Sequence, residues 1–309
     1  MGVGRRRALA CLLIAVGVIS VAGLVSCGNA AVSTRNSLPP RASLPLPLRV
    51  EASVHGAFVT RRLTVPKGYG SAGRPFYVDE RRSGGVAEPL VLLLPGLDQS
   101  PARVEHATAA TAFSDAAHFT LVYPIGEKEA WNAGDCCRRD SANDVGYLVD
   151  LVHYVATLTP VDLHHVYIWG FSNGGMMAWR AICQTRNIFA GAGVMSGALL
   201  VNCPTPVHVV DVHGLNDATV PYEGGYSHYT HTVMPDSATE RSRLVAGSTL
   251  DVVLLTHLGH EWPPLHPGSF DALNAFWQRL RGYGVAHPAT ETVPIEAPAA
   301  RAIGGTREG

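Results

Sequence analysis

Hydrophobic residues along the chain follow two patterns: short apolar or alternating runs, and longer stretches with a helical period. Residues 90–94 are a continuous run of Leu and Val, which is typical of a strand buried on both faces. Residues 58–65 and 76–81 alternate apolar and polar positions and predict an early antiparallel pair. The same criteria predict further strands at residues 120–123, 165–169, 191–195, 207–212 and 250–256.

Helical stretches lie between these strands. Residues 144–158 are apolar along one helical face and begin at Asp144, a residue suited to cap a helix. Residues 102–118, 173–183 and 270–280 predict three more helices. Strands that alternate with helices predict an α/β fold with a mostly parallel sheet and helices on both faces. We expect one such catalytic domain over residues 49–285.

Composition and charge narrow the classes of function. With 47% hydrophobic and 16% charged residues, the 309-residue chain is too apolar to be disordered throughout. Its 24 basic and 25 acidic residues leave a net charge of −1, and no long basic run is present to pair with phosphates. Nucleic acid is therefore not an expected partner, and no motif implies a cofactor.

The amino-terminal segment has the profile of an export signal. Three arginines at positions 5–7 precede an apolar stretch over residues 8–25, and residues 24–27 read Leu-Val-Ser-Cys, which resembles a bacterial lipobox. We expect residues 1–27 to be a lipoprotein signal peptide with Cys27 as the acylated residue. The protein is then extracytoplasmic, anchored to the membrane through Cys27 or secreted. An uncleaved membrane anchor is the alternative, and the arginines fit general or twin-arginine export.

Two segments lack any hydrophobic period. Residues 28–48 are rich in Ser and Pro, and residues 286–309 are rich in Pro, Ala and Gly. We expect the first to be a disordered tether and the second a disordered tail.

Four cysteines remain for the catalytic domain after Cys11 and Cys27 are set aside: Cys136, Cys137, Cys183 and Cys203. In an oxidising compartment an even number predicts two disulfides, with three possible pairings. Because a bond between adjacent cysteines is strained, we expect Cys136 and Cys137 each to pair with one of the later two. Free thiols or a metal site are alternatives, although the spacing lacks the paired ligands of a zinc site, so no metal is expected.

A nucleophile candidate stands between a predicted strand and a predicted helix. Residues 170–174 read Gly-Phe-Ser-Asn-Gly, a Gly-x-Ser-x-Gly nucleophile elbow. The tight strand-to-helix turn requires glycine on both sides of Ser172. The free NH groups of the following helix favour the negative charge that develops in acyl transfer. The alternative is a glycine-rich turn with a capping serine.

A serine nucleophile needs a base, and the base needs an orienting carboxylate, which the elbow fold supplies in the order Ser, acid, His. Asp217 follows the strand predicted at residues 207–212 and is favoured over Asp211, which lies inside that strand. His260 lies in the loop after the strand at residues 250–256 and is favoured over His257 at the strand end.

With these positions in place, the chain resembles the secreted polyhydroxyalkanoate depolymerase and feruloyl esterase group of the α/β-hydrolases, in a lipoprotein form. The matching blocks, in that group's order, are residues 131–132 with 135–137, 143–147, 170–177, 213–214 with 217 and 220–222, and 259–263. The resemblance implies Ser172 as nucleophile, Asp217 as acid and His260 as base. It also implies an oxyanion hole formed by the backbone NH groups of Asn173 and Leu97.

One block departs from that group. Where the group has His-Gly after its third strand, this chain has Pro95-Gly96, followed by Leu97 and Asp98. The NH of Leu97 can still donate, because proline removes only its own NH. An inward Asp98 carboxylate, however, weakens the oxyanion hole.

These features predict an exported serine hydrolase that cleaves carboxylic esters through an acyl-enzyme: hydroxyalkanoate oligomers, feruloyl or acetyl esters, or other small esters. An acyltransferase or serine peptidase on the same scaffold is one alternative, because the fold does not fix the acceptor. A non-catalytic surface lipoprotein is the other. Trp131 and Trp262 are candidates for an aromatic substrate-binding face, with packing as the alternative. The sequence does not indicate an oligomeric state.

Overall fold

The computed structural model describes residues 53–55, 58–81, 85–137 and 141–285. The predicted signal peptide with Cys27, the tether and the tail lie outside these residues. The part described belongs to one domain.

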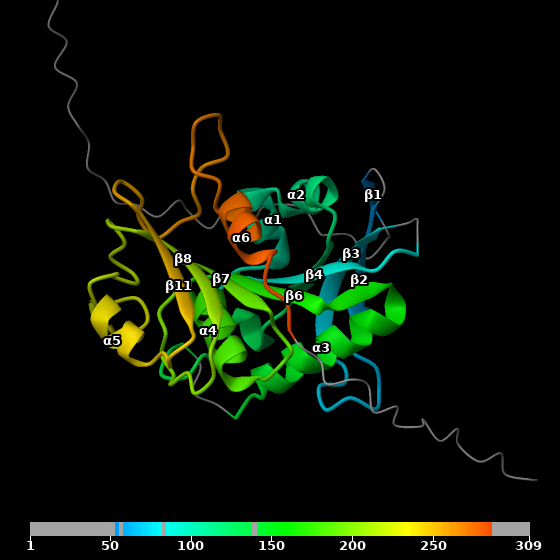
Figure 1. Cartoon of the computed structure of the whole chain (residues 1–309), viewed down its shortest axis with the longest axis horizontal. Helices are drawn as coiled ribbons and strands as arrows, with labels where there is room; N and C mark the ends of the chain where they lie inside the picture. Colours follow the sequence, from blue (N-terminus) through cyan, green and yellow to red (C-terminus); the bar gives the residue numbers. More distant parts are fainter. Residues whose placement is uncertain (1–52, 56–57, 82–84, 138–140, 286–309) are drawn as a thin grey trace, which may run out of the picture. The chain divides into compact units, whose positions relative to one another are not determined.

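Nine of the described strands form one sheet in the order β1-β2-β3-β5-β4-β6-β7-β8-β11 (Figure 1). The pairs β1–β2, β2–β3 and β3–β5 are antiparallel, and the remaining neighbours are parallel. The mostly parallel sheet predicted from the sequence is therefore confirmed. The strand bounds are β1 Ser53–His55, β2 Phe58–Thr64, β3 Pro75–Arg81, β4 Glu88–Leu94, β5 Thr120–Pro124, β6 Val161–Phe171, β7 Gly191–Met195, β8 His208–Gly214 and β11 Thr249–Leu255.

Helices cover both faces of this sheet (Figure 1). Helices α3 (Asp144–Leu158) and α4 (Asn173–Gln184) pack on one face, and α1 (Pro101–Thr108), α2 (Ala110–Ala117) and α6 (Ala272–Leu280) pack on the other. The sequence did not predict α5 (Ser237–Ser242), the short 3-10 turn Glu127–Glu129, or the hairpin of β9 (Gly225–Ser227) and β10 (Thr232–Met234).

The core consists of two apolar layers, one on each side of the sheet. Along β4, Leu90, Leu92 and Leu94 enter the layer under α3 and α4, whereas Val91 and Leu93 enter the layer under α1, α2 and α6. Successive side chains of a strand point to opposite faces, so a strand buried on both faces must be apolar at every position. This explains the continuous run at residues 90–94.

The single helix predicted at residues 102–118 is wrong: the structure has two helices with a break at Ala109. Ala109 has a φ of 50°, and its NH closes α1 on the Glu105 carbonyl. The Glu105 carboxylate then accepts hydrogen bonds from the Thr111 NH at 3.0 Å and from the Tyr123 hydroxyl. These tertiary contacts hold a left-handed alanine that helix propensity alone disfavours.

The predicted disulfide pairing is also wrong. The four cysteines do form two disulfides, but Cys136 bonds with Cys137 and Cys183 bonds with Cys203. Cys183, in the last turn of α4, has its Cα only 4.6 Å from that of Cys203, well within bridging distance. Cys137 has a φ of 74°, a left-handed conformation that turns the chain at the adjacent pair. The fold places the later two cysteines beside each other.

Within the described residues, no helix combines the length and the apolar character needed to cross a membrane.

Candidate active site

Ser172 occupies a strained turn between β6 and α4. Its backbone has a φ of 52° and a ψ of −123°, its NH donates to the Met195 carbonyl at 2.9 Å, and the residue is 7% exposed. A non-glycine residue in this region of backbone space costs of the order of 1–3 kcal/mol and persists only where the surroundings enforce it. Such strain is typical of a nucleophile elbow.

The glycines that flank Ser172 are required by close backbone contacts. A Cβ at Gly170 would lie 2.3 Å from the Gly174 carbonyl oxygen, and one at Gly174 would lie 2.4 Å from the carbonyl oxygens of Leu94 and Pro95. Both distances are far below van der Waals contact. The Gly-x-Ser-x-Gly pattern is therefore explained by packing of β4, β6 and α4 around the serine.

Asp217 lies in the loop after β8 and is 4% exposed. Its Oδ1 accepts hydrogen bonds from the NH groups of Thr219 and Val220 at 2.9 and 2.7 Å, and its Oδ2 lies 2.7 Å from His260 Nδ1. Burial alone would raise the pKa of Asp217, but the hydrogen bond and charge of His260, together with the Val220 NH and His213, lower the pKa below its usual value. The acid is therefore held as a carboxylate.

His260, in the loop after β11, connects this acid to the serine. Its Nε2 lies 2.8 Å from Ser172 Oγ. Because the Asp217 carboxylate only accepts, Nδ1 donates to it, and Nε2 is left to accept the Ser172 proton. The structure therefore brings together the three predicted residues, in the arrangement of a catalytic triad. Asp211 does not contact His260.

The backbone NH groups of Leu97 and Asn173 are the predicted donors of an oxyanion hole. Neither the Leu97 NH nor the Asn173 NH donates to another group in the described part of the chain. Asn173 is the first residue of α4, so its NH is one of the unpaired donors of a helix amino terminus. Both NH groups are therefore without a hydrogen-bond partner among the described residues, and their role in binding an oxyanion stays a prediction.

Trp131 supports this region from the core and does not line the pocket described below. Its indole NH donates to the Pro95 carbonyl at 2.8 Å, its backbone NH donates to the Asn173 side-chain carbonyl at 2.7 Å, and its ring stacks on Tyr147. The residue is 1% exposed. Of the two roles considered for Trp131, packing is the one it has, and it ties the loop after β4 to the start of α4.

The loop after β4, where Pro95 and Asp98 differ from the esterase group that the sequence resembles, is fixed by hydrogen bonds. The Pro95 carbonyl accepts from Trp131, and the Asp98 NH donates to the Glu129 carbonyl at 2.9 Å. Asp98 has a φ of 55° and an exposed side chain. An exposed carboxylate is screened by water, which limits its effect on a neighbouring anion.

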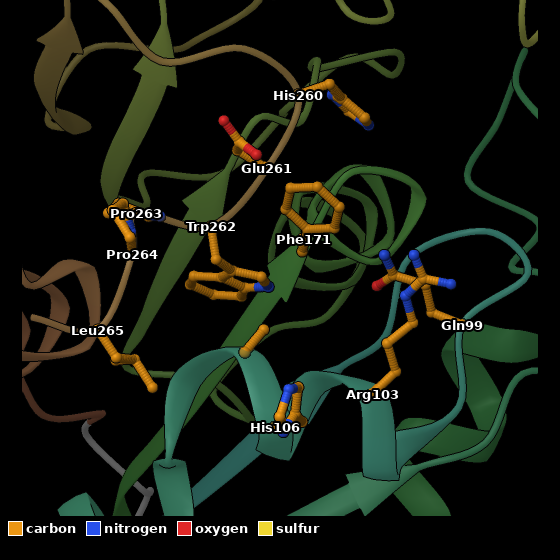
Figure 2. Close-up of a pocket in the computed structure, with 11 residues that line it drawn as sticks. Gln99, Arg103, His106, Phe171, His260, Glu261, Trp262, Pro263, Pro264 and Leu265 are labelled. Carbon is orange, nitrogen blue, oxygen red and sulfur yellow. The ribbon is translucent and has the colours of Figure 1, made fainter. Parts of the chain in front are cut away.

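A pocket of about 380 Å³ opens beside His260 (Figure 2). The rings of Phe171 and Trp262 form one wall, with centroids 5.7 Å apart and planes inclined by 31°. Gln99 and Arg103 lie on the opposite side (Figure 2). A second pocket of about 400 Å³ shares the wall from Trp262 to Leu265 and leads toward α6. Trp262 thus lines a pocket next to the triad.

Several residues that line this pocket were not predicted from the sequence. Phe171 precedes the nucleophile within the elbow, so its place next to the serine was a usable signal. Gln99, in the loop after β4, and Arg103, on α1, gave no signal, because only the packing of these two segments near the loop that follows residue 260 brings them there. Among the described residues, no group of three or more His, Cys, Asp or Glu side chains is placed to hold a metal ion.

Comparisons with known proteins can be set beside this geometry. No protein-family model matches the chain. "Putative esterase NocK" of Nocardia uniformis subsp. tsuyamanensis is 33% identical over 144 residues, which cover 44% of this chain and 42% of that protein. The bifunctional acetylxylan esterase/xylanase XynS20E of Neocallimastix patriciarum is 28% identical over 157 residues, covering 49% and 22%. Feruloyl esterase B of Piromyces equi is 28% identical over 159 residues, covering 47% and 29%. The chain therefore spans less than half the length of these relatives.

Two solved structures with a similar backbone carry hydrolase names. An S-formylglutathione hydrolase from Agrobacterium tumefaciens has a TM-score of 0.54 at 13% identity, over 75% of this chain and 99% of that one. The chain has the α/β-hydrolase fold. A "Putative Dienelactone Hydrolase" from Klebsiella pneumoniae subsp. pneumoniae has a TM-score of 0.52 at 15% identity, over 74% of this chain and 98% of that one. At these identities the likeness concerns the fold alone.

Proposed function

We propose that this α/β-hydrolase is a carboxylic ester hydrolase that works through an acyl-enzyme. The observation that carries the proposal is the hydrogen-bonded series Asp217–His260–Ser172, with distances of 2.7 and 2.8 Å. The esterase names of the partial relatives support the same chemistry.

In the first step, Ser172 Oγ attacks the ester carbonyl carbon while its proton passes to His260 Nε2. The carbonyl electron pair moves to oxygen, and the resulting oxyanion binds the NH groups of Leu97 and Asn173. The intermediate then collapses, the alcohol leaves with the proton of His260, and the acyl group remains on Ser172. In the second step, water loses a proton to His260 and attacks the acyl-enzyme, which releases the acid and restores Ser172.

The pocket beside His260 supports the proposal that the substrates are esters with a flat or apolar group. Phe171 and Trp262 offer aromatic surface, and Gln99 and Arg103 offer hydrogen-bond donors. Feruloyl-type esters, acetyl esters and hydroxyalkanoate oligomers all combine such groups with carbonyl acceptors. We propose these small esters and oligomers as the substrate class. Rates of hydrolysis measured on a panel of these compounds, together with nitrophenyl esters of increasing acyl length, would rank them.

We also propose that the protein is exported and anchored to the membrane through Cys27. The support comes from the basic, apolar and lipobox-like segments over residues 1–27. The two disulfides of the catalytic domain are consistent with an oxidising compartment.

The decisive experiment compares Ser172→Ala with wild type on a short-chain nitrophenyl ester. We expect at least about a 10⁴-fold loss of kcat, because the nucleophile is removed. Ser242→Ala, a change of an exposed serine on α5, is the matched control and should retain full activity. A fluorophosphonate probe should label the wild type and the control but not Ser172→Ala. An inactive, unlabelled wild type, or an active Ser172→Ala variant, contradicts the proposal.

A further inference from the structure

A second histidine, His213, lies directly behind the triad acid. It is the penultimate residue of β8 and is 2% exposed. Its Nε2 lies 2.7 Å from the Val220 carbonyl oxygen and 3.6 Å from Asp217 Oδ2, the oxygen that also contacts His260. His213 therefore faces both the acid and the loop that carries the acid.

The hydrogen-bonding groups around His213 determine where its protons lie. The Val220 carbonyl can only accept, so Nε2 must carry a proton. The other nitrogen, Nδ1, lies 3.9 Å from Asp211 Oδ1, and neither atom has a hydrogen-bond partner among the described residues. A lone pair on Nδ1 facing a buried carboxylate is unfavourable, whereas a proton there converts the contact into an attraction. This arrangement favours the doubly protonated, positively charged ring.

The charges around His213 agree with this protonation state. Burial alone would lower the pKa of His213, but the nearby Asp211 carboxylate, the Val220 carbonyl and the charge of Asp217 raise it to about 9. The titratable groups that interact with the ring are Asp211, Asp217, Tyr222 and Glu240, while His260 contacts the far side of this group through Asp217 and Arg243 interacts with Glu240. Two of these groups, Asp211 and Asp217, are the anions that balance a buried cation at His213.

We propose that His213, as a buried imidazolium, is a positioning residue that holds Asp217 in place and keeps the neighbouring base neutral. The inference deepens the proposed esterase function and rests on it. Two contacts carry it: the hydrogen bond to Val220, and the 3.6 Å approach to Asp217 Oδ2.

The first contact orients the carboxylate through the loop. The Val220 NH donates to Asp217 Oδ1 at 2.7 Å, while the carbonyl of the same residue accepts from His213 at 2.7 Å. His213 thus fixes the residue that fixes Asp217. Without His213, Val220 loses its hydrogen bond to a β8 side chain, and Asp217 is less well aimed at His260.

The second contact acts through charge. A cation beside Asp217 stabilises the carboxylate and opposes a second positive charge on His260. A residue that only filled space would not have this effect.

The test is the pH profile of kcat/KM for His213→Gln. The rate is measured by chromatography of the released acid, because this readout does not itself depend on pH. Glutamine keeps an amide donor for the Val220 carbonyl but has no charge. We expect kcat/KM to fall about tenfold and the acid limb to move about one pH unit higher. His208→Gln is the matched control, because His208 lies at the other end of β8 and stacks on Tyr283; it should keep the wild-type profile.

A second measurement does not depend on the variant folding. Imidazole ¹⁵N NMR of the wild-type protein at pH 8 should show one buried histidine with both nitrogens protonated, and that signal should be missing from His213→Gln. A neutral His213 ring at pH 8 overturns the proposal. A folded His213→Gln variant with an unmoved acid limb also overturns it, whatever its rate. A wild type with no esterase activity instead contradicts the proposed function, and the NMR result then stands separately.

Discussion

Asp211 and Asp217 are close together in the sequence, but only Asp217 contacts His260. Asp211 is inside β8 and faces His213 across 3.9 Å, whereas the loop that follows carries Asp217 to within 2.7 Å of His260. We predict that Asp217→Asn lowers kcat by about 10³–10⁴-fold, because an amide no longer fixes the donating Nδ1 of the imidazole. The measurement is steady-state turnover of a short-chain nitrophenyl ester.

Asp211→Asn is the control for this change. It should keep activity within about tenfold of wild type and lose stability instead, because it removes a buried charge partner of His213. If the Asp211 variant loses turnover with its fold intact while the Asp217 variant remains active, Asp217 is not the triad acid.

Glu240 on α5 is a buried carboxyl whose protonation should make stability depend on pH. Burial, and then the charge of Asp211, raise the pKa of Glu240 to about 8 in the folded protein. A carboxyl with a raised folded pKa favours folding while it is protonated, so this stability is present at low pH and is lost as pH rises toward 8. Its loss contributes up to about 1.4 kcal/mol per pH unit to the free energy of unfolding.

We therefore predict that Glu240→Gln is more stable than wild type at pH 8 and that its stability falls less between pH 6 and pH 8. Glutamine keeps the acceptor for the Leu199 NH, which lies 2.9 Å from Glu240 Oε1. The measurement is urea unfolding at several pH values. An equal alkaline loss of stability in both proteins would show that Glu240 is ionised in the fold.

Individual site residues were easiest to predict where the spacing of neighbouring residues in the sequence is itself characteristic of the catalytic role. Ser172 lies between two glycines, and His260 follows an apolar strand, so local spacing alone was enough to assign both. His213 and Trp131 could not be assigned in this way. His213 contacts Val220 and Asp211, and Trp131 contacts Pro95 and Asn173. These contacts depend on how separate segments pack.

At the scale of elements, the strands were predictable because burial on both faces leaves a continuous apolar run, as in β4. The break at Ala109 was not, because an alanine carries no sequence signal for a left-handed backbone, and the Glu105 contacts that stabilise it come from Thr111 and Tyr123. The disulfide pairing failed for a similar reason. Adjacency of Cys136 and Cys137 suggested strain, whereas the positions of Cys183 and Cys203 depend on the packing of α4.

The two disulfides should contribute unequally to stability. The bond from Cys183 to Cys203 spans 20 positions, and closing such a loop in the unfolded chain is worth about 3 kcal/mol in the chain-entropy model. The bond between Cys136 and Cys137 spans one position and closes almost no chain. We predict that the double change of Cys183 and Cys203 to Ala lowers the free energy of unfolding by about 2–4 kcal/mol with turnover retained.

The matched comparison is the double change of Cys136 and Cys137 to Ala, which should have a smaller effect on global unfolding. Denaturant unfolding of the three proteins, with turnover measured on each, gives both quantities. A larger loss from the adjacent pair would show that local contacts of that turn, rather than loop closure, set the contribution.

At the scale of the whole molecule, the parallel strands explain why residues far apart in sequence meet. The carboxyl ends of β4, β6, β8 and β11 lie at one edge of the sheet, and the loops that follow them carry Leu97, Ser172, Asp217 and His260. An α/β sheet binds its ligands at this edge. The order of the motifs along the chain therefore sufficed to predict one site, while the shape of the pocket required α1 and the loop after His260.

The predicted lipoprotein signal would hold this domain at the membrane. If residues 1–27 act as a lipoprotein signal, Cys27→Ala should abolish incorporation of a fatty-acid analogue and shift the protein from the membrane fraction to the medium or to an uncleaved precursor. A single acyl chain binds membranes only marginally, so stable attachment requires the diacylated amino terminus that lipobox processing supplies. Cys11→Ala, which changes the cysteine within the apolar stretch, is the matched control and should still be labelled. Equal labelling of the Cys27 variant and wild type would exclude Cys27 as the lipid site, and membrane retention without any label would favour an uncleaved anchor.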